Sequence, residues 1–311
     1  MTAATDLAPE ITPELRQLMA ELGPRWLENT AGHVRQMTEA FSLLHRASKR
    51  EKQIERRDIA YGAHPRQALD VYLPKVAGTG RPAVIFVHGG AFTEGHRNRS
   101  DEIYGNVLRY VSRHGIVGVN IGYRLADDAQ FPEATRDVAA AVAWTQAHAD
   151  ELGIDPARIF LMGHSAGGAH VASYAYDRRW QPAEGHGLAG VIIVSGRVRA
   201  DNLPENTNAR RVEAYYGTDA SRYDDMSGVT HVTADSPPTF VAWSQYENAL
   251  IDVYCTELVW RLGIAKRRAP PTCYCPGHNH TSIIAHLDTA EDVLGAAIRK
   301  FIGTPETTLT R

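Results

Sequence analysis

The chain has 311 residues, of which 43% are hydrophobic and 22% charged, the composition of an ordinary soluble globular protein. Its 33 basic and 36 acidic residues give a net charge of −3, so no overall field attracts nucleic acid or an anionic membrane. No apolar run reaches transmembrane length, and the N-terminus lacks the basic-then-apolar order of a signal peptide. We therefore expect a cytoplasmic protein without nucleic-acid or membrane partners.

Two amphipathic helices are predicted within residues 1–55. The first begins at Thr12-Pro13-Glu14, which supplies an N-cap, a first-position proline and a first-turn acid, and it ends at Gly23-Pro24. The second ends in the charged run 49–57, which we interpret as a solvated helix end and linker. Both helices have apolar faces to bury. We expect residues 1–55 to form a helical lid over a second domain, residues 56–311, or to pack on its flank.

From about Arg57 the pattern changes to strands that alternate with helices. Residues 58–61 and 69–74 alternate in side-chain character, as in a half-exposed antiparallel pair, whereas the apolar run 83–87 suits a central strand. Further strands are predicted at 116–121, 158–162, 190–194, 239–243 and 271–275, and helices from Ser100, from Pro132, over 166–176, over 209–216 within the long loop 198–236, over 249–262 and through Phe301. This alternation predicts an α/β fold with a mostly parallel sheet covered by helices on both faces.

The run Gly163-His164-Ser165-Ala166-Gly167 lies where an apolar strand passes directly into a helix. Gly-x-Ser-x-Gly in that context is typical of a sharp turn that exposes the Ser165 hydroxyl beside the N–H groups of the next helix. A Cβ at Gly163 or Gly167 would collide with neighbouring backbone. We therefore interpret Ser165 as a nucleophile rather than an incidental serine in a glycine-rich connection.

His88-Gly89-Gly90 directly follows the central apolar strand. Two successive glycines let backbone N–H groups approach a ligand closely, and acyl transfer needs such donors for the oxyanion that develops on the carbonyl oxygen. Together with the Ser165 turn, this favours an oxyanion hole over a plain glycine turn. The predicted donors are the N–H groups of Gly89, Gly90 and Ala166.

These motifs, with Gly122-Tyr123-Arg124-Leu125 and Phe131-Pro132-Glu133-Ala134, resemble the α/β-hydrolase superfamily. The similarity is greatest to the esterase/lipase branch that includes hormone-sensitive-lipase-like carboxylesterases and kynurenine formamidases, and it runs from about Asp58 to the C-terminus. The resemblance implies the α/β-hydrolase fold, with an eight-stranded sheet. It also implies a catalytic triad in the chain order serine, acid, histidine.

Within this resemblance, the base lies in the loop after the last strand, where both His278 and His280 fit. We favour His280, because the Thr-Ser-Ile-Ile that follows it matches the segment after the family histidine. The acid falls on Glu247, after the strand that begins at Pro237-Pro238, although aspartate is more usual there. Asp252 is the alternative, but it lies a turn into the next predicted helix.

The spacing of Cys273, Cys275, His278 and His280 also permits a metal site, since alternate strand residues face the same way. A histidine bound to zinc could not serve as the base, so we predict no metal and no cofactor. With Cys255 the cysteines are an odd number, and reduced thiols are the simplest interpretation.

Seven further positions stand out in the sequence. Phe92, Trp243 and Tyr246 are weak candidates for lining a substrate pocket, because aromatic residues near strand ends are more often core. His88 and His164 are interpreted as packing or hydrogen-bonding residues. Arg124 and Asp137 are expected to form a buried pair or a helix-cap group.

The expected activity is cofactor-free hydrolysis of small to medium soluble esters through an acyl-enzyme on Ser165. Cleavage of arylformamides, other amides or carbamates by the same residues is the alternative, because the triad does not separate esters from amides. A catalytically silent binding protein on this fold is a second alternative. The expected partner is a small-molecule ester or amide, and a homodimer is compatible with the sequence.

Overall fold

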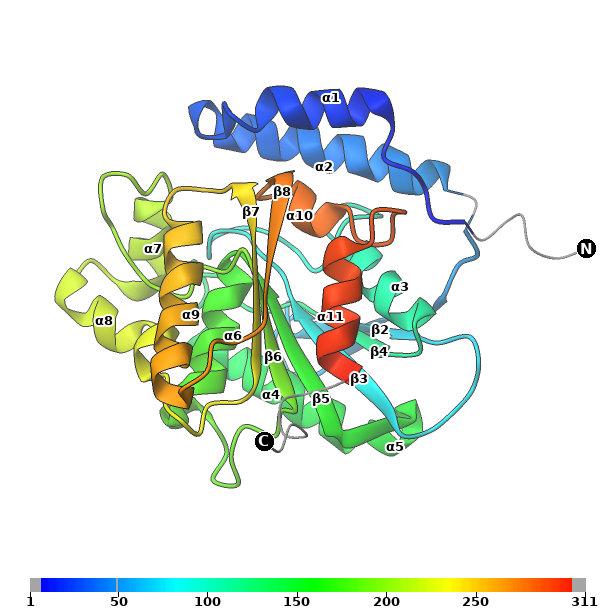
Figure 1. The fold of residues 1–311 in the computed structure, drawn as a ribbon. Coiled ribbons are helices and arrows are strands. Elements are labelled where there is room, and N and C mark those ends of the chain that lie inside the picture. Colours follow the sequence, from blue (N-terminus) through cyan, green and yellow to red (C-terminus); the bar gives the residue numbers. More distant parts are fainter. Residues whose placement is uncertain (1–6, 49, 304–311) are drawn as a thin grey trace, which may run out of the picture.

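The computed structural model describes residues 7–48 and 50–303 as one α/β unit (Figure 1). Its strands are β1 Ile54–Ala60, β2 Ala68–Leu73, β3 Arg81–Val87, β4 Val117–Ile121, β5 Ile154–His164, β6 Gly190–Val194, β7 Thr239–Tyr246 and β8 Thr272–Asn279. Its α-helices are α1 Pro13–Leu22, α2 Thr30–Ala47, α3 Gly105–Arg113, α4 Glu133–Ala147, α5 Ala149–Leu152, α6 Ala166–Tyr176, α7 Ala209–Tyr216, α8 Tyr223–Met226, α9 Ile251–Lys266, α10 Ser282–Ala285 and α11 Val293–Gly303.

All eight strands form a single sheet in the order β1-β2-β4-β3-β5-β6-β7-β8. Strand β2 pairs antiparallel with both β1 and β4, and the other neighbours pair in parallel. The predicted mostly parallel, eight-stranded α/β-hydrolase sheet is therefore confirmed. Because parallel strands end at one edge, the loops after β3, β5, β7 and β8 are brought together there.

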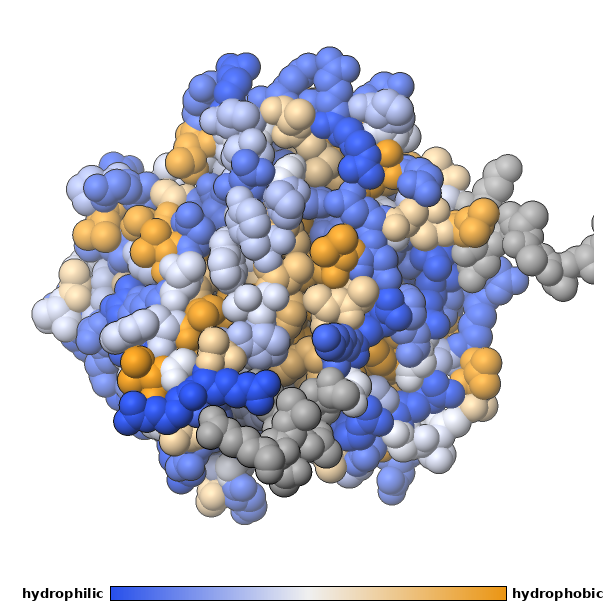
Figure 2. Space-filling model, viewed as in Figure 1, coloured by the Kyte–Doolittle hydropathy of each residue, from blue (hydrophilic) through white to orange (hydrophobic). Residues whose placement is uncertain are grey.

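The two faces of the sheet carry separate hydrophobic cores. Along β3, Ala83, Ile85 and Val87 point into one core, with α4, α6 and α9, while Val84 and Phe86 point into the other, with α3 and α11. The strand is buried on both sides, which explains why it appears in the sequence as a continuous apolar run. Figure 2 shows that hydrophilic side chains cover most of the outer face in this view, with hydrophobic ones in small groups among them.

Several element boundaries differ from the sequence prediction: β5, β7 and β8 are longer than predicted, α9 is shifted, and β1 and α3 begin elsewhere. Strand β1 begins at Ile54, so the end of the charged run belongs to an edge strand rather than to a linker; Arg57 there pairs with Glu55. Helix α3 begins at Gly105 instead of after Ser100. The Ser100 hydroxyl does accept bonds from the N–H groups of residues 102 and 103, but Tyr104 has a positive φ of 75°, which interrupts the helix before it starts.

Helices α1 and α2 lie across the edge of the sheet at which the parallel strands end (Figure 1). Helix α1 begins as predicted, with the Thr12 hydroxyl accepting from the N–H of Leu15 at 3.2 Å. Between the helices, Trp26 is 2% exposed and donates its indole N–H to the Asn248 side chain at 2.7 Å. The N-terminal helices are thereby joined to the loop that follows β7.

The packing of Trp26 gives a test of this attachment. We expect Trp26→Ala to lower the free energy of unfolding by about 3–5 kcal/mol, because it empties a buried site and leaves Asn248 without its donor. Urea unfolding followed by circular dichroism measures the loss. Leu27→Ala, one residue further on and 53% exposed, is the matched control and should change little. Equal effects of the two changes would contradict this packing.

Candidate active site

Ser165 occupies a strained turn between β5 and α6. Its backbone has φ 56° and ψ −124°, a conformation that L-residues rarely adopt and that costs about 1–3 kcal/mol. A Cβ on Gly163 would lie 2.7 Å from the Gly167 carbonyl oxygen, and one on Gly167 would lie 2.1 Å from the Val87 oxygen. Both glycines are therefore required by close backbone approach, as predicted. The turn presents the Ser165 hydroxyl at the cavity described below.

The imidazole of His280 joins Ser165 to Glu247. Its Nε2 lies 2.9 Å from the Ser165 Oγ, and its Nδ1 lies 2.5 Å from Glu247 Oε2. The backbone N–H of His280 donates to the Tyr246 carbonyl at 2.9 Å, so the loop after β8 is held to the end of β7. Three residues predicted from distant parts of the sequence thus form one hydrogen-bonded chain.

The second oxygen of the Glu247 carboxylate is also bound. Oε1 accepts from the N–H of Ser244 at 2.9 Å, from the Ser244 hydroxyl at 2.7 Å and from the Ser195 hydroxyl. Burial alone would raise the pKa of Glu247, but the His280 imidazole and these hydrogen bonds outweigh it and lower the pKa below its usual value. The carboxylate is therefore ionised at neutral pH and fixed towards Nδ1 of His280.

The rival residues lie elsewhere. His278 contacts Glu291 through Nε2 at 2.9 Å and Ser282 through Nδ1 at 3.1 Å, and the hydrogen bond to His278 lowers the pKa of Glu291 to about 2. Asp252 is exposed on the first turn of α9. The structure therefore brings His280 and Glu247 to the serine and leaves both alternatives in other contacts.

The glycine loop after β3 differs in detail from the prediction. Gly89 approaches Ser165 closely, since a Cβ on it would lie 2.8 Å from the Ser165 Cβ. Its N–H, however, donates to the Tyr104 hydroxyl at 3.3 Å, whereas Gly90 and Ala91 line the cavity. Ala91 has a positive φ of 47°, which turns the loop at this point. The predicted donor Gly89 is thus engaged by a tyrosine.

Sequence reasoning missed a polar chain behind the histidine. Tyr104 OH accepts from Arg99 at 3.1 Å and lies 3.3 Å from Nδ1 of His164, whose Nε2 lies 3.0 Å from the His280 carbonyl oxygen. Burial lowers the pKa of His164 well below its usual value, so the ring is neutral, with its Nε2–H donating to that carbonyl. No local motif marks Tyr104 or Arg99. Ser195 could have been found, because it directly follows a parallel strand at the same edge of the sheet.

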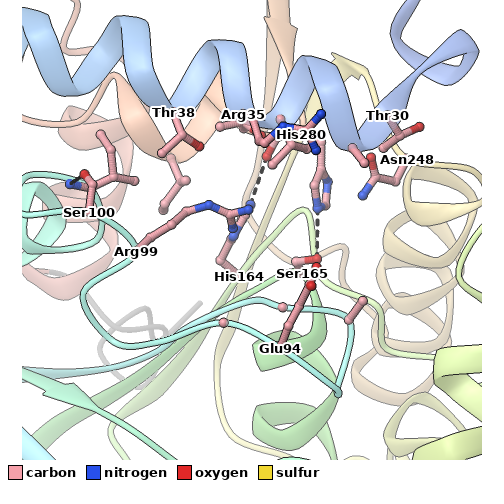
Figure 3. A pocket seen from close by; sticks show the side chains of 18 of the residues that line it. Thr30, Arg35, Thr38, Glu94, Arg99, Ser100, His164, Ser165, Asn248 and His280 are labelled. Carbon is pink, nitrogen blue, oxygen red and sulfur yellow. Dashed lines mark hydrogen bonds between the residues drawn. The ribbon is translucent and has the colours of Figure 1, made fainter.

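A cavity of about 1170 Å³ is lined in part by Ser165, His164 and His280 (Figure 3). This volume is ample for a medium-sized ligand, because ligand pockets usually measure about 300–1,000 Å³. One wall is formed by helix α2, and the others come from the loop after β3 and from residues near α7. The N-terminal helices therefore contribute directly to the candidate site.

The three aromatic residues proposed as pocket lining do not line this cavity. Phe92 has a positive φ of 71°, is 1% exposed and stacks on Tyr215 with the ring centroids 5.0 Å apart. The ring of Trp243 lies 6.3 Å from that of Tyr274, and the half-buried ring of Tyr246 packs closely against Gly23. The aromatic prediction is corrected accordingly, and all three belong to packing.

The remaining predicted positions have structural contacts. His88 is buried and stacks on Tyr123 at 4.3 Å. Arg124 and Asp137 form the expected pair, at 2.6 Å. The sulfurs of Cys273 and Cys275 are 3.9 Å apart, and residues 7–48 and 50–303 contain no cluster of three or more His, Cys, Asp or Glu side chains placed to bind a metal.

Comparisons with known proteins show what the chain as a whole resembles. The BD-FAE family model matches residues 69–180. Esterase LipC of Mycobacterium tuberculosis is 28% identical over 75% of this chain and 61% of its own length, and carboxylesterase NlhH of the same organism is 32% identical over 57% of this chain and 56% of its own. A hyperthermophilic esterase from the archaeon Pyrobaculum calidifontis has the same fold, with a TM-score of 0.71, 19% identity and coverage of 94% of this chain and 98% of that one.

The curated relatives are matched over only part of their length, 61% for LipC and 56% for NlhH. The residues matched by the BD-FAE family model, 69–180, include β3, β5 and the Ser165 turn. In the described part of the chain, every helix is too short or too polar to span a bilayer.

Buried neutral histidines near the site make stability depend on pH. Burial lowers the pKa values of His88 and His164 well below the usual 6.5, and those of His170 and His286 to about 3. As the pH falls below 6.5, the unfolded chain binds protons that the folded chain does not. The free energy of unfolding should then fall by up to about 1.4 kcal/mol per histidine per pH unit.

His170 provides the specific test, because neither of its ring nitrogens has a hydrogen-bond partner in the described structure. Between about pH 7 and pH 5, His170→Phe should bind about one proton fewer on unfolding than the wild type. The free energy of unfolding, measured with urea, should therefore fall less steeply as the pH is lowered. Val171→Ala, at the next buried position of α6, removes no ionisable group, so this control should keep the original slope. An unchanged slope in His170→Phe would contradict the assignment.

Proposed function

The chain belongs to the esterase/lipase branch of the α/β-hydrolase superfamily, and on this premise we propose that it hydrolyses small to medium carboxylic esters with Ser165 as nucleophile. The observation that carries the proposal is the hydrogen-bonded chain from Ser165 through His280 to Glu247 at the edge of a large cavity. In this arrangement a nucleophile, a base and an orienting acid are within hydrogen-bonding reach of one another.

In the first half-reaction, Ser165 Oγ attacks the ester carbonyl carbon while His280 Nε2 takes the hydroxyl proton. The carbonyl electron pair moves onto oxygen. When it returns, the bond to the alcohol oxygen breaks, and the imidazolium gives its proton to that oxygen. The products of this half-reaction are an acyl-serine and a free alcohol, with His280 neutral again.

In the second half-reaction, His280 takes a proton from water, whose oxygen attacks the acyl carbon. Breakdown of the tetrahedral intermediate releases the carboxylic acid, and the proton on His280 returns to Ser165. Glu247 holds the tautomer in which Nδ1 carries a proton, and its negative charge stabilises the imidazolium formed in each half-reaction.

The negative charge on the carbonyl oxygen needs N–H donors near Ser165. We assign this role to Gly90, Ala91 and Ala166, because none of their N–H groups has a recorded partner in the described chain, whereas that of Gly89 donates to Tyr104. Ala166 is the first residue of helix α6, so its N–H is one of the unsatisfied groups of a helix start. The glycine loop supplies the others.

We also propose that residues 1–55 act as a cap on a catalytic domain of residues 56–311. Helix α2 forms one wall of the cavity, and a substrate reaching Ser165 passes beside it. Of this segment, residues 1–6 and 49 lie outside the described structure.

Removing the nucleophile tests the proposal directly. We expect wild-type protein to hydrolyse 4-nitrophenyl acetate and butyrate, and Ser165→Ala to lower kcat by about 10³-fold or more. Release of nitrophenolate measures both, and a fluorophosphonate probe should label the wild type alone. Parallel rates on N-formylkynurenine compare ester with formamide cleavage. Retention of most of the rate in Ser165→Ala would disprove the assignment.

The two neighbouring histidines form a matched pair. We expect His280→Gln to lose about 10³-fold in kcat, since no base remains, and Glu247→Gln to lose about 10²–10⁴-fold, since the tautomer of His280 is no longer held. His278→Gln should keep most of the activity, because His278 contacts Glu291 and Ser282 instead of the serine. Circular dichroism verifies that each variant is folded. The reverse pattern for the two histidines would refute this choice of base.

A further inference from the structure

The cavity beside Ser165 is rich in arginine. Four arginines line it, Arg35, Arg46, Arg99 and Arg211. Arg211 forms an ion pair with Glu94 at 2.5 Å, and Arg46 lies 3.9 Å from Glu102. Neither of the other two forms an ion pair with any carboxylate of residues 7–48 or 50–303.

Of these four arginines, Arg99 is the one connected by hydrogen bonds, in the described structure, to Gly89 beside Ser165. It is partly buried, and one of its terminal nitrogens donates to the Tyr104 hydroxyl at 3.1 Å. The same hydroxyl accepts from the N–H of Gly89, the residue against the Ser165 Cβ. Figure 3 shows the Arg99 side chain extending into the cavity beside His164. A single tyrosine hydroxyl therefore connects the Arg99 guanidinium to the glycine loop beside Ser165.

The guanidinium of Arg99 lies over the Tyr104 ring, 5.8 Å from the centroid, and its remaining N–H donors have no hydrogen-bond partner in the described structure. A planar guanidinium can donate two parallel hydrogen bonds to one carboxylate, and such pairs are among the stronger polar contacts in proteins. A partly buried, unpaired cation at the base of a cavity lowers the energy of an anion that enters it. A neutral ester needs no such group.

None of the carboxylates that line the cavity cancels the positive charge of Arg99. Arg35 lines the cavity from helix α2 and forms no ion pair in the described structure, but it is exposed like Glu39 on the same helix, so solvent screens its charge as well (Figure 3). Among the lining acids, Glu94 is neutralised by Arg211, and Glu28 by Arg25 at 2.9 Å. Glu39 has no ion pair, but it is exposed on α2, where solvent screens its charge.

We propose that the preferred substrates are esters that carry a carboxylate or similar anionic group, bound by Arg99 with Arg35 on the facing wall. This inference rests on the proposed ester hydrolysis and names its substrate class. The anion accepts from the free donors of Arg99 while the ester carbonyl lies at Ser165. Binding an anion at Arg99 does not alter the bonds made and broken in the two half-reactions.

Two pairs of esters, matched in shape, test the preference. The first compares 4-nitrophenyl hydrogen adipate with 4-nitrophenyl methyl adipate and places the charge on the acyl side. The second compares 4-acetoxybenzoate with its methyl ester and places the charge on the leaving alcohol. Each ratio of kcat/KM is divided by the ratio of the spontaneous rates. We expect one pair to favour the anion by about tenfold, and the preference to shrink as salt is added.

Arg99→Gln separates binding of the anion from a purely structural role. If Arg99 binds the anion, the preference falls about tenfold, towards unity. If Arg99 only holds Tyr104 and the glycine loop, rates for the charged and neutral esters fall together and the preference stays. Arg99→Lys should restore part of the preference, since it keeps the charge but loses the paired donors. Arg222→Gln, an exposed arginine that does not line the cavity, is the charge-matched control and should leave the preference unchanged.

The outcomes separate this inference from the proposed function. Hydrolysis of the neutral esters without a preference for either anion would overturn the inference and leave ester hydrolysis standing. A preference that survives Arg99→Gln would overturn the assignment of Arg99. Failure to hydrolyse any of the four esters would overturn the proposed function, and the inference with it.

Discussion

The imidazole of His280 is the contact on which the candidate site depends. Through one ring it joins the turn after β5 to the loop after β7, and its backbone joins the loop after β8 to the end of β7. The parallel sheet makes this meeting possible, because its strands deliver their final residues to one edge. The hydrogen bond between Nδ1 and Glu247 sets the orientation of the ring and its tautomer, and a second contact holds the backbone of His280. Glu247 binds Nδ1 of the His280 ring, and the Nε2–H of His164 donates to the backbone carbonyl of His280.

The strain at Ser165 is maintained by this surrounding structure. A residue with φ 56° and ψ −124° persists only where its neighbours leave no better alternative. The glycines at 163 and 167 allow three backbone segments to come within contact distance, and the N–H of Ser165 donates to the Ser195 carbonyl at 3.1 Å. Ser165 is thus positioned by backbone geometry, while the side chain hydrogen-bonded to its hydroxyl, that of His280, comes from another loop.

Much of this could be predicted from sequence, for a physical reason. Buried parallel strands appear as uninterrupted apolar runs, and glycines at 163 and 167 mark a turn with too little room for a Cβ. Residues predicted by the family resemblance, such as His280 and Glu247, lie together in the structure, and their roles stay predictions. These features are local or follow from the order of strands, so a linear pattern can carry them.

What escaped prediction depends on approach between segments. Ser100 has the side chain of a helix cap, but the positive φ of Tyr104 delays the helix to Gly105. The sequence predicts that Phe92 lines a pocket, but its backbone also has a positive φ and its ring stacks on Tyr215 in the core. The contacts of Tyr104 with Gly89 and His164 join segments that are 15 and 60 residues apart, and no spacing rule announces them.

The indole of Trp26 has a consequence for how this protein is handled. Its partner Asn248 directly follows Glu247 in the chain. The hydrogen bond from Trp26 therefore holds the N-terminal segment next to the carboxylate that contacts His280. Shortening the amino-terminal end past Trp26, or rebuilding it in a fusion, therefore acts on the orientation of a carboxylate more than two hundred positions away in the sequence. In this molecule the same N-terminal segment, through helix α2, also borders the cavity that Ser165 lines.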